Sequence, residues 1–295
     1  MHNKNNFPEI SRYVFGTLLL KDPERHTRLI NMALDAGVWF HSCYLYGCVN
    51  DGNLLGKVLK ERPGSLPGII CKISGETAEE IRHGVESSLS LMGLEQVNIV
   101  QLSRKAGKRK DFLVDDFKNV GPIRETCEKM RSEGKVGHYI MEIFCSCAED
   151  GIEAVHEGLF DGYTFHYSLV QREATNELFD LLRKEQEPVV SMKTATGGYV
   201  DPVRFRKTIE EHPDRRDVQI YQRLRELYEA SGSRDWLDFT FRFLFSQPNV
   251  KATAGGTTDP DHLEAFLEAS RDIRPLDPAI LEEILKIQAE FMEHV

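Results

Sequence analysis

The sequence predicts an α/β protein built as a single (β/α)8 TIM barrel. Eight short apolar segments of strand length alternate with amphipathic helical segments along the 295 residues. No linker rich in proline or serine divides them, and the chain is long enough to bury one large core without disulfides. A doubly wound parallel sheet is the alternative arrangement of the same elements.

The predicted strands are apolar runs that end at polar or turn residues. They cover residues 12–20, 38–40, 68–73, 97–102, 136–144, 163–169, 188–192 and 250–254. Parallel strands joined by helices are covered on both faces, so their sequences are nearly continuous in apolar residues. This pattern predicts that all eight strands belong to one parallel sheet.

Capping residues mark the helices between these strands. Asp22 and Pro23 open the first helix, and Thr77 with Glu80 forms a capping box before a helix that ends at Gly93. Further helices are predicted over residues 54–62, 117–133, 149–159, 174–184 and 236–245.

Two segments depart from the repeat, although residues 1–295 are expected to form one domain. Residues 195–233 are a charged insertion after the seventh strand, and residues 278–295 are a C-terminal helix. The basic residues of the insertion are Arg204, Arg206, Lys207, Arg215 and Arg216. Two interpretations stay open, namely a solvated pair of charged helices and a clamp over an acidic substrate.

Composition restricts the classes of partner. The formal net charge of -10 argues against nucleic-acid binding, and no apolar run approaches the length that spans a membrane. The six cysteines have neither zinc-site spacing nor the density of a disulfide scaffold. We therefore expect reduced thiols, no metal site, a cytoplasmic location and a monomer or small homo-oligomer.

The segment VWFHSCYLYG, residues 38–47, is the centre of the predicted site. Its first three residues are apolar, whereas His41, Ser42, Tyr44 and Tyr46 follow at the C-terminal end of the strand. Ligands bind at that end of the strands in folds that alternate strands and helices. This segment is therefore expected to lie at the ligand-binding end of the strands, with His41 and Tyr46 as its candidates for chemistry.

Short motifs along nearly the whole chain resemble those of the aldo-keto reductase superfamily. They are FHSCYLYG, LLGKVL, IICK, SLSLMGL, GKVGHYI, HYSLVQR and GGTTDPDHLEAFL. Their order and spacing are specific for the family fold. The resemblance implies a small carbonyl compound as substrate and NADPH as cofactor, whereas function itself must be argued from the site.

The family's catalytic tetrad consists of an aspartate, a tyrosine, a lysine and a histidine. By motif, the tyrosine falls on Tyr46 and the lysine on Lys72. The aspartate position holds His41 and the histidine position holds Ser103. A neighbouring cation favours an ionised phenol, so Lys72 is expected to lower the pKa of Tyr46. Without the family's carboxylate, we expect nothing to hold the Lys72 charge, and His41 to carry or orient a proton.

The positions that contact the nicotinamide nucleotide in the family are also changed. Glu142 and Ile143 stand where the family has a Ser-Asn pair that binds the carboxamide. Thr258 replaces the basic residue for the 2′-phosphate, and Phe266 replaces the asparagine beside the adenine. These changes predict either no cofactor or weak NADPH binding, and they leave Glu142 as a pocket residue.

The turn after the last strand has a second interpretation as an anion site. It contains Gly255, Gly256, Thr257 and Thr258 and leads into a helix that begins near Pro260. Free backbone N–H groups and the helix dipole favour an anion at such a turn, including a cofactor phosphate. An ordinary capped helix start is the alternative.

Two more residues of the strand ends are candidates for the pocket. His166, in the sixth strand, is either a core histidine or a site residue. Lys193 ends the seventh strand, where it is a solvated lysine, an anion contact or an amine nucleophile.

Three functional hypotheses follow. The first is an enzyme that uses Tyr46 and Lys72 for non-redox acid-base chemistry, such as dehydration, isomerisation or lyase cleavage. The second is an NADPH-dependent reductase in which His41 and Ser103 complete a variant tetrad. The third is a non-catalytic binding or regulatory protein on the same fold. The presence of both Tyr46 and Lys72 favours an enzyme.

Overall fold

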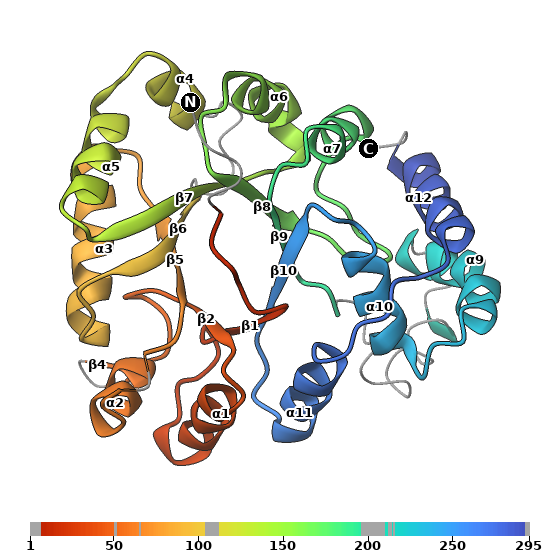
Figure 1. Cartoon of the computed structure of the whole chain (residues 1–295), viewed down its shortest axis with the longest axis horizontal. Coiled ribbons are helices and arrows are strands. Elements are labelled where there is room, and N and C mark those ends of the chain that lie inside the picture. Colours follow the sequence, from red (N-terminus) through yellow and green to blue (C-terminus); the bar gives the residue numbers. More distant parts are fainter. Residues whose placement is uncertain are drawn as a thin grey trace.

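The computed structural model describes residues 7–49, 52–64, 66–103, 112–195, 210–211, 214 and 216–292. Eight strands form a closed barrel in the order β1, β10, β9, β8, β7, β6, β5, β2. All neighbouring pairs in the barrel are parallel. Helices form a ring outside the strands (Figure 1). The predicted TIM barrel is confirmed, and the doubly wound sheet is excluded.

All eight predicted strands exist, but several are shorter than predicted. They are β1 (Tyr13–Gly16), β2 (Trp39–Ser42), β5 (Ile69–Ser74), β6 (Val97–Ser103), β7 (Val136–Glu142), β8 (Gly162–His166), β9 (Val189–Met192) and β10 (Val250–Gly255). Apolar residues beyond the true ends, such as Leu20, Ile143 and Leu169, are buried in loops. Apolar character therefore predicted burial correctly and strand length less well. A hairpin of β3 (Cys48–Val49) and β4 (Gly52–Asn53) was not predicted.

The helices of the described chain follow the predicted alternation. They are α1 (Pro23–Asp35), α2 (Leu54–Glu61), α3 (Ala78–Met92), α4 (Phe112–Lys118), α5 (Pro122–Ser132), α6 (Ala148–Glu157), α7 (Asn176–Lys184), α9 (Arg216–Ala230), α10 (Trp236–Phe245), α11 (Pro260–Ala269) and α12 (Pro278–Met292). Thr77 caps α3 as predicted, since its Oγ1 accepts the Glu80 N–H at 3.2 Å, and Gly93 ends the helix with a φ of 68°. The return contact of the predicted capping box is displaced by one residue, because Glu80 Oε2 accepts the Glu76 N–H at 2.7 Å.

The single helix predicted over residues 117–133 is instead two helices, α4 and α5. Val120 has a left-handed φ of 54°, and Pro122 is the first residue of α5. A positive φ interrupts a helix, whereas proline suits its first turn. Asp116 stabilises the junction, because its carboxylate accepts the backbone N–H of Arg124 at 2.7 Å.

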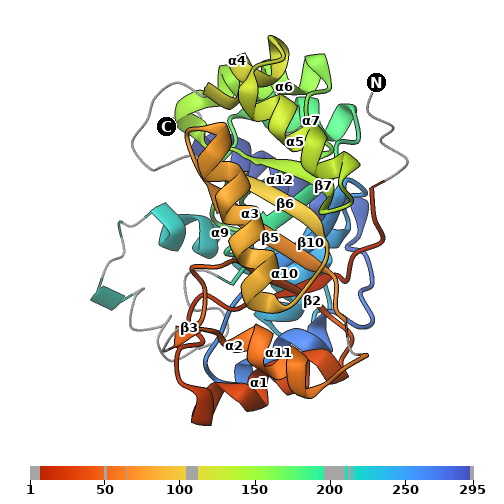
Figure 2. The same cartoon turned by 90° about the vertical axis from the view of Figure 1, so that its left-hand side faces the viewer.

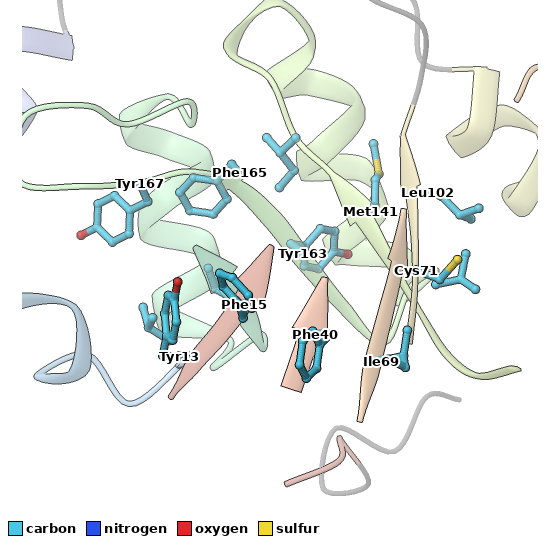
Figure 3. Packing of buried hydrophobic residues seen from close by; sticks show 14 of the residues in the cluster. Tyr13, Phe15, Phe40, Ile69, Cys71, Leu102, Met141, Tyr163, Phe165 and Tyr167 are labelled. Atoms are coloured by element: carbon cyan, nitrogen blue, oxygen red, sulfur yellow. The ribbon is translucent and has the colours of Figure 1, made fainter. Parts of the chain in front are cut away.

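The strands place apolar side chains in two clusters. On β5, Ile69, Cys71 and Ile73 pack with helix residues, whereas Ile70 packs with Ile99. Figure 3 shows part of the larger cluster. The smaller cluster consists of Val14, Ile70, Ile99, Ile140, Val190, Met192, Ala252 and Ala254. Because it contains strand residues from around the barrel and no helix residue, it is the barrel interior.

The predicted insertion is described in part. Residues 216–230 form α9, which packs against α12, and Figure 1 shows both helices outside the barrel. In Figure 2, α9 lies to the left of the strands. The predicted C-terminal helix is α12, described to Met292. The residues Arg204, Arg206, Lys207 and Arg215 lie outside the described part of the chain. The clamp over an acidic substrate therefore stays a prediction.

The described cysteines are free thiols, as the spacing of the cysteines predicts. They are Cys43, Cys71, Cys127, Cys145 and Cys147. Within the described residues, no group of three His, Cys, Asp or Glu side chains is arranged to hold a metal ion. None of the described helices is long and apolar enough to cross a membrane.

The loop after β2 depends on Gly47, which we predict cannot be replaced without loss of stability. Its φ is +57°, and a Cβ there would lie 2.9 Å from the Leu20 carbonyl oxygen. We expect Gly47→Ala to lower the free energy of unfolding by more than about 2 kcal/mol, because left-handed strain and a displaced loop add together. Urea unfolding measures this loss.

Gly158→Ala is the matched control, because Gly158 has a similar φ of +58° and no heavy atom of the described chain within 4 Å of the same Cβ position. Only the strain applies there, and the expected loss is about 1 kcal/mol. Equal losses in the two variants would contradict the importance of the Leu20 contact.

Candidate active site

The C-terminal ends of five neighbouring strands bring polar side chains to one mouth of the barrel. These residues are His41 on β2, Lys72 on β5, Gln101 on β6, Glu142 on β7 and His166 on β8. Each lies two residues after an inward-facing position, so it continues the inner face of its strand. Candidates from separate stretches of sequence therefore meet above the apolar interior.

Lys72 and Glu142 form an ion pair between β5 and β7. Lys72 Nζ lies 3.0 Å from Glu142 Oε2 and 3.1 Å from Oε1. The Glu142 side chain is 4% exposed and the Lys72 side chain 25% exposed. The expectation that nothing holds the Lys72 charge is therefore wrong. A buried carboxylate that lacks a paired cation is costly, so Lys72 and Glu142 fix each other's position.

His41 is neutral and held by Gln101. The distance from His41 Nε2 to Gln101 Oε1 is 2.8 Å, and both side chains are buried. Burial lowers the pKa of His41 to about 4; the Gln101 hydrogen bond acts in the opposite sense, and the Lys72 charge lowers the pKa further. When the neutral ring donates its Nε2 proton to Gln101, Nδ1 is left as a proton acceptor.

Tyr46 lies on the loop after β2, and the side chain of Asn53 holds the backbone of this loop in place. Asn53 Nδ2 donates to the Tyr46 carbonyl at 2.7 Å and to the Cys43 carbonyl at 3.1 Å. The Tyr46 ring is edge-on to the His41 ring, with 5.8 Å between centroids. This arrangement brings the phenol to the same mouth as the strand residues.

The pKa of Tyr46 is shifted upward, contrary to the prediction. Burial raises the pKa of Tyr46, and the neighbouring Cys43, Glu142 and Cys71 raise it further. The net shift therefore opposes the lowering that Lys72 was expected to produce. Because Glu142 is bound to Lys72, a carboxylate accompanies the cation at this site. Tyr46 keeps its proton at neutral pH.

Ser103, at the end of β6, contributes a hydroxyl without a partner among the described residues. The residue is 2% exposed, and its Oγ makes no hydrogen bond there. A buried hydroxyl in this state is uncommon and is often found where a ligand or water completes the bonding. Ser103 therefore stays a candidate site residue.

His166 and Lys193 extend the site to β8 and β9. His166 is partly buried, and burial lowers its pKa; Lys193 and Lys72 lower it further, whereas Glu173 and Glu142 raise it. These electrostatic contacts connect His166 to the other residues of the mouth. Lys193 is exposed directly after β9 and has a left-handed φ of 55°. Both residues thus belong to the pocket side of the barrel.

The turn before α11 has the contacts of a capped helix start, which is one of the two predicted alternatives. The Asp259 carboxylate caps the helix and accepts the N–H groups of Asp261 and His262, at 2.9 and 3.5 Å. These backbone groups are therefore already bonded, and their partner is itself an anion. Gly256 is explained by packing, because a Cβ on it would lie 2.6 Å from the Gly16 carbonyl oxygen.

The remaining residues of this turn, Gly255, Thr257 and Thr258, also have structural contacts or lie at the surface. Tyr13 donates to the Gly255 carbonyl at 2.8 Å, and Thr257 Oγ1 accepts the Asp259 N–H at 3.0 Å. Thr258 is exposed. The described contacts support the capped helix start as the simpler account of the turn.

Phe266, at the position that the family resemblance assigns to an adenine contact, is part of the core. It is buried and stacks on Tyr13, with ring centroids 5.1 Å apart and an interplanar angle of 9°. The residues at three positions thus fit the nicotinamide nucleotide poorly. Glu142 is bonded to Lys72, Asp259 occupies the N-terminus of α11, and Phe266 is stacked in the core.

Two residues that position the site were missed from sequence. Gln101 holds the His41 ring, and Asn53 holds the loop after β2 through the carbonyls of Cys43 and Tyr46. The alternation of β6 signals Gln101, because a polar residue two positions after Ile99 continues the inward face. Asn53 had no comparable signal, since its contacts depend on the hairpin that precedes α2.

The fold and the site define a parallel β/α barrel with a cluster of titratable groups at its C-terminal mouth, which is where barrel enzymes carry their active sites. The model of the aldo/keto reductase family matches residues 14–289. The chain therefore belongs to the aldo/keto reductase family.

Solved structures of this family share the fold. An aldo/keto reductase from Klebsiella pneumoniae in complex with NADP and acetate has a TM-score of 0.67 and 14% identity, covering 95% of this chain and 92% of its own. The apo form of an aldo-keto reductase from Bacillus halodurans has a TM-score of 0.67 and 20% identity, covering 94% and 92%. At these identities the likeness concerns the fold. Comparison with curated protein sequences gives no match.

The low pKa of His41 predicts a contribution to the pH dependence of stability. The unfolded chain takes up a proton at this residue near pH 6.5, whereas the folded protein does so at about 4. His41 therefore contributes a loss of stability, on the order of 3 kcal/mol, as pH falls between these values. We expect the free energy of unfolding of His41→Gln to fall less over this range.

Chemical denaturation at a series of pH values measures the difference. The exposed His83 provides the control, and His83→Gln is expected to follow the wild type. Identical pH profiles for wild type and His41→Gln would show that His41 is not held neutral by burial.

Proposed function

We propose that the protein catalyses non-redox acid-base chemistry on a small carbonyl compound, of the dehydratase, isomerase or lyase type. The observation that carries this proposal is the Lys72–Glu142 ion pair beside Tyr46. The pair supplies a carboxylate-bound lysine near a phenol. In this pair the Glu142 carboxylate is bonded to Lys72, although Glu142 stands at the position where the resemblance implies a contact to the nicotinamide carboxamide.

Tyr46 is assigned as the general acid. Its raised pKa keeps the phenol protonated, so the hydroxyl can donate a hydrogen bond or a proton to a carbonyl oxygen. Lys72 is assigned to the stabilisation of the negative charge that develops on that oxygen. In this assignment Lys72 acts on the reacting oxygen, because burial and Glu142 oppose any lowering of the Tyr46 pKa.

His41 is assigned as the second proton carrier. With its Nε2 bonded to Gln101 and its pKa near 4, the ring is neutral at pH 7 and offers Nδ1 as an acceptor. Transfer of a proton from the carbon next to the carbonyl to His41, with donation from Tyr46 to the oxygen, gives an enol. In an isomerisation, His41 returns its proton to a different carbon of an enediol or conjugated enol, and Tyr46 regains its proton as the carbonyl forms. In an elimination, the enol returns its hydroxyl proton to Tyr46, and the leaving group departs from the β carbon with the proton of His41 as the carbon–carbon double bond forms.

An NADPH-dependent reductase is the second candidate, because the Lys72–Glu142 pair restores a carboxylate beside the lysine that the family's tetrad also contains. The similar structure from Klebsiella pneumoniae is of an aldo/keto reductase in complex with NADP, which motivates this candidate. The core position of Phe266 and the Asp259 cap count against it here.

Replacement of the Tyr46 hydroxyl tests the acid-base assignment. A panel of small aldehydes and ketones in D2O, without added cofactor, is followed by NMR for deuterium uptake at the carbon next to the carbonyl. We expect Tyr46→Phe to slow the exchange of reactive compounds by about 10² to 10⁴, the usual worth of a positioned acid-base group.

Tyr44→Phe is the matched control, since Tyr44 lies on the same loop and its ring packs against the exposed His83 at 6.0 Å. It is expected to exchange at the wild-type rate. Wild-type exchange in Tyr46→Phe would refute the assignment, and no exchange with any compound would favour the non-catalytic alternative.

Nucleotide binding separates the two enzyme candidates. Given Glu142, Asp259 and Phe266, we expect weak or absent binding of both NADPH and NADH, without preference for NADPH. Titration followed by energy transfer from tryptophan fluorescence measures both affinities. Micromolar and NADPH-selective binding would overturn the non-redox proposal in favour of the reductase.

A further inference from the structure

We propose that Lys193 and His166 form a contact site for an anionic group, carboxylate or phosphate, on the carbonyl substrate. The inference rests on the proposed function, because it names the class of compound that the same mouth accepts. It is carried by the backbone conformation of Lys193, by the hydroxyl cluster that holds this conformation, and by the neighbouring side chain of His166.

Lys193 has a backbone conformation that side chains other than glycine rarely adopt. Its φ of 55° is one of three positive values at non-glycine residues of the described chain. The other two, at Val120 and Gln186, lie just after α4 and α7, where a left-handed residue commonly ends a helix. Lys193 instead ends a barrel strand. Strain at such a position is typical of functional sites.

A cluster of buried hydroxyl groups fixes the backbone on both sides of Lys193. Ser191 Oγ lies 2.8 Å from Thr194 Oγ1 and 3.2 Å from Thr253 Oγ1, and it donates to the Tyr167 carbonyl at 3.0 Å. Thr194 and Thr253 are hydrogen-bonded to each other. The residues before and after the lysine are therefore attached to β9 and β10. This attachment holds Lys193 at the mouth in its left-handed conformation.

His166 is the neighbour of this site on β8. It pairs in register with Met192, the residue before Lys193. The positive charge of Lys193 contributes to the lowered pKa of His166, after burial. At neutral pH the His166 ring is uncharged and carries one N–H group. An ammonium and an adjacent imidazole N–H together suit an anionic oxygen.

The charged side chains around the site allow the proposed role of Lys193 to be tested. Lys72, the cation on β5, is already bound to Glu142. Glu173 and Glu142 are acidic neighbours of His166. The Glu173 backbone N–H donates to the His166 carbonyl, and its carboxylate accepts from Gln171 Nε2 at 3.3 Å. An anion bound at Lys193 is attracted by the ammonium and repelled by Glu173. The two residues therefore predict opposite mutational effects.

Binding of inorganic phosphate and of acetate to the full-length protein tests the proposal without requiring turnover. We expect both anions to shift the NMR resonances of the His166 ring in a saturable manner. Tighter binding of phosphate would indicate a phosphorylated substrate, and tighter binding of acetate a carboxylic acid. Lys193→Met should weaken binding by about tenfold, which corresponds to about 1.4 kcal/mol, whereas Lys193→Arg should retain it and Glu173→Gln should strengthen it.

Two control variants test whether the loss of any exposed lysine, or the relief of any left-handed residue, changes anion binding. Lys286→Met removes an exposed lysine on α12 and should bind both anions as the wild type does. Gln186→Gly relieves a similar left-handed conformation with a φ of 55° and should also leave binding unchanged, whereas Lys193→Gly should lose it.

Unchanged affinity in Lys193→Met would overturn the proposal. If that variant does not fold, the wild-type titration decides, and unshifted His166 resonances would overturn it equally. Anion binding does not require Tyr46, so loss of exchange in Tyr46→Phe with intact anion binding supports both proposals. Failure of anion binding with normal exchange removes the anion site alone.

Discussion

The ion pair between Lys72 and Glu142 is the interaction on which the mouth of the barrel depends. It joins β5 to β7 across the intervening β6, with a carboxylate that is almost fully withdrawn from water. Removing one member of such a pair typically costs about 3 to 5 kcal/mol, because an uncompensated charge stays buried. The pair also influences its neighbours, since Glu142 raises the pKa of Tyr46 and Lys72 lowers that of His41.

The apolar interior below this pair explains why the pKa values of Tyr46 and His41 differ from those of free side chains. Val14, Ile70, Ile99 and Ile140 belong to the cluster that fills the barrel, so polar residues placed above it lose contact with water. Burial is the largest cause of the shifts at both Tyr46 and His41. The result is a neutral phenol that can donate a proton and a neutral imidazole that can accept one, beside a charged pair.

The mouth also concentrates features that reduce stability. Lys193 keeps a left-handed backbone, and Ser103 buries a hydroxyl that has no partner among the described residues. By motif, the family's carboxylate position on β2 holds His41, whereas Glu142 brings a carboxylate to the lysine from β7. A barrel permits such an exchange because its strand ends converge, so the same chemical group can reach the centre from different strands.

The sequence by itself determined the barrel, its eight strands and most of its helices, because apolar periodicity and caps are local signals. It also identified Tyr46, Lys72, His41 and Glu142 as neighbours at strand ends. Only the tertiary structure decided that Glu142 binds Lys72 and that Gln101 holds His41, since these partners are 70 and 60 residues apart in the chain. The pKa of Tyr46 likewise depends on burial and on Glu142, which no local pattern of residues specifies.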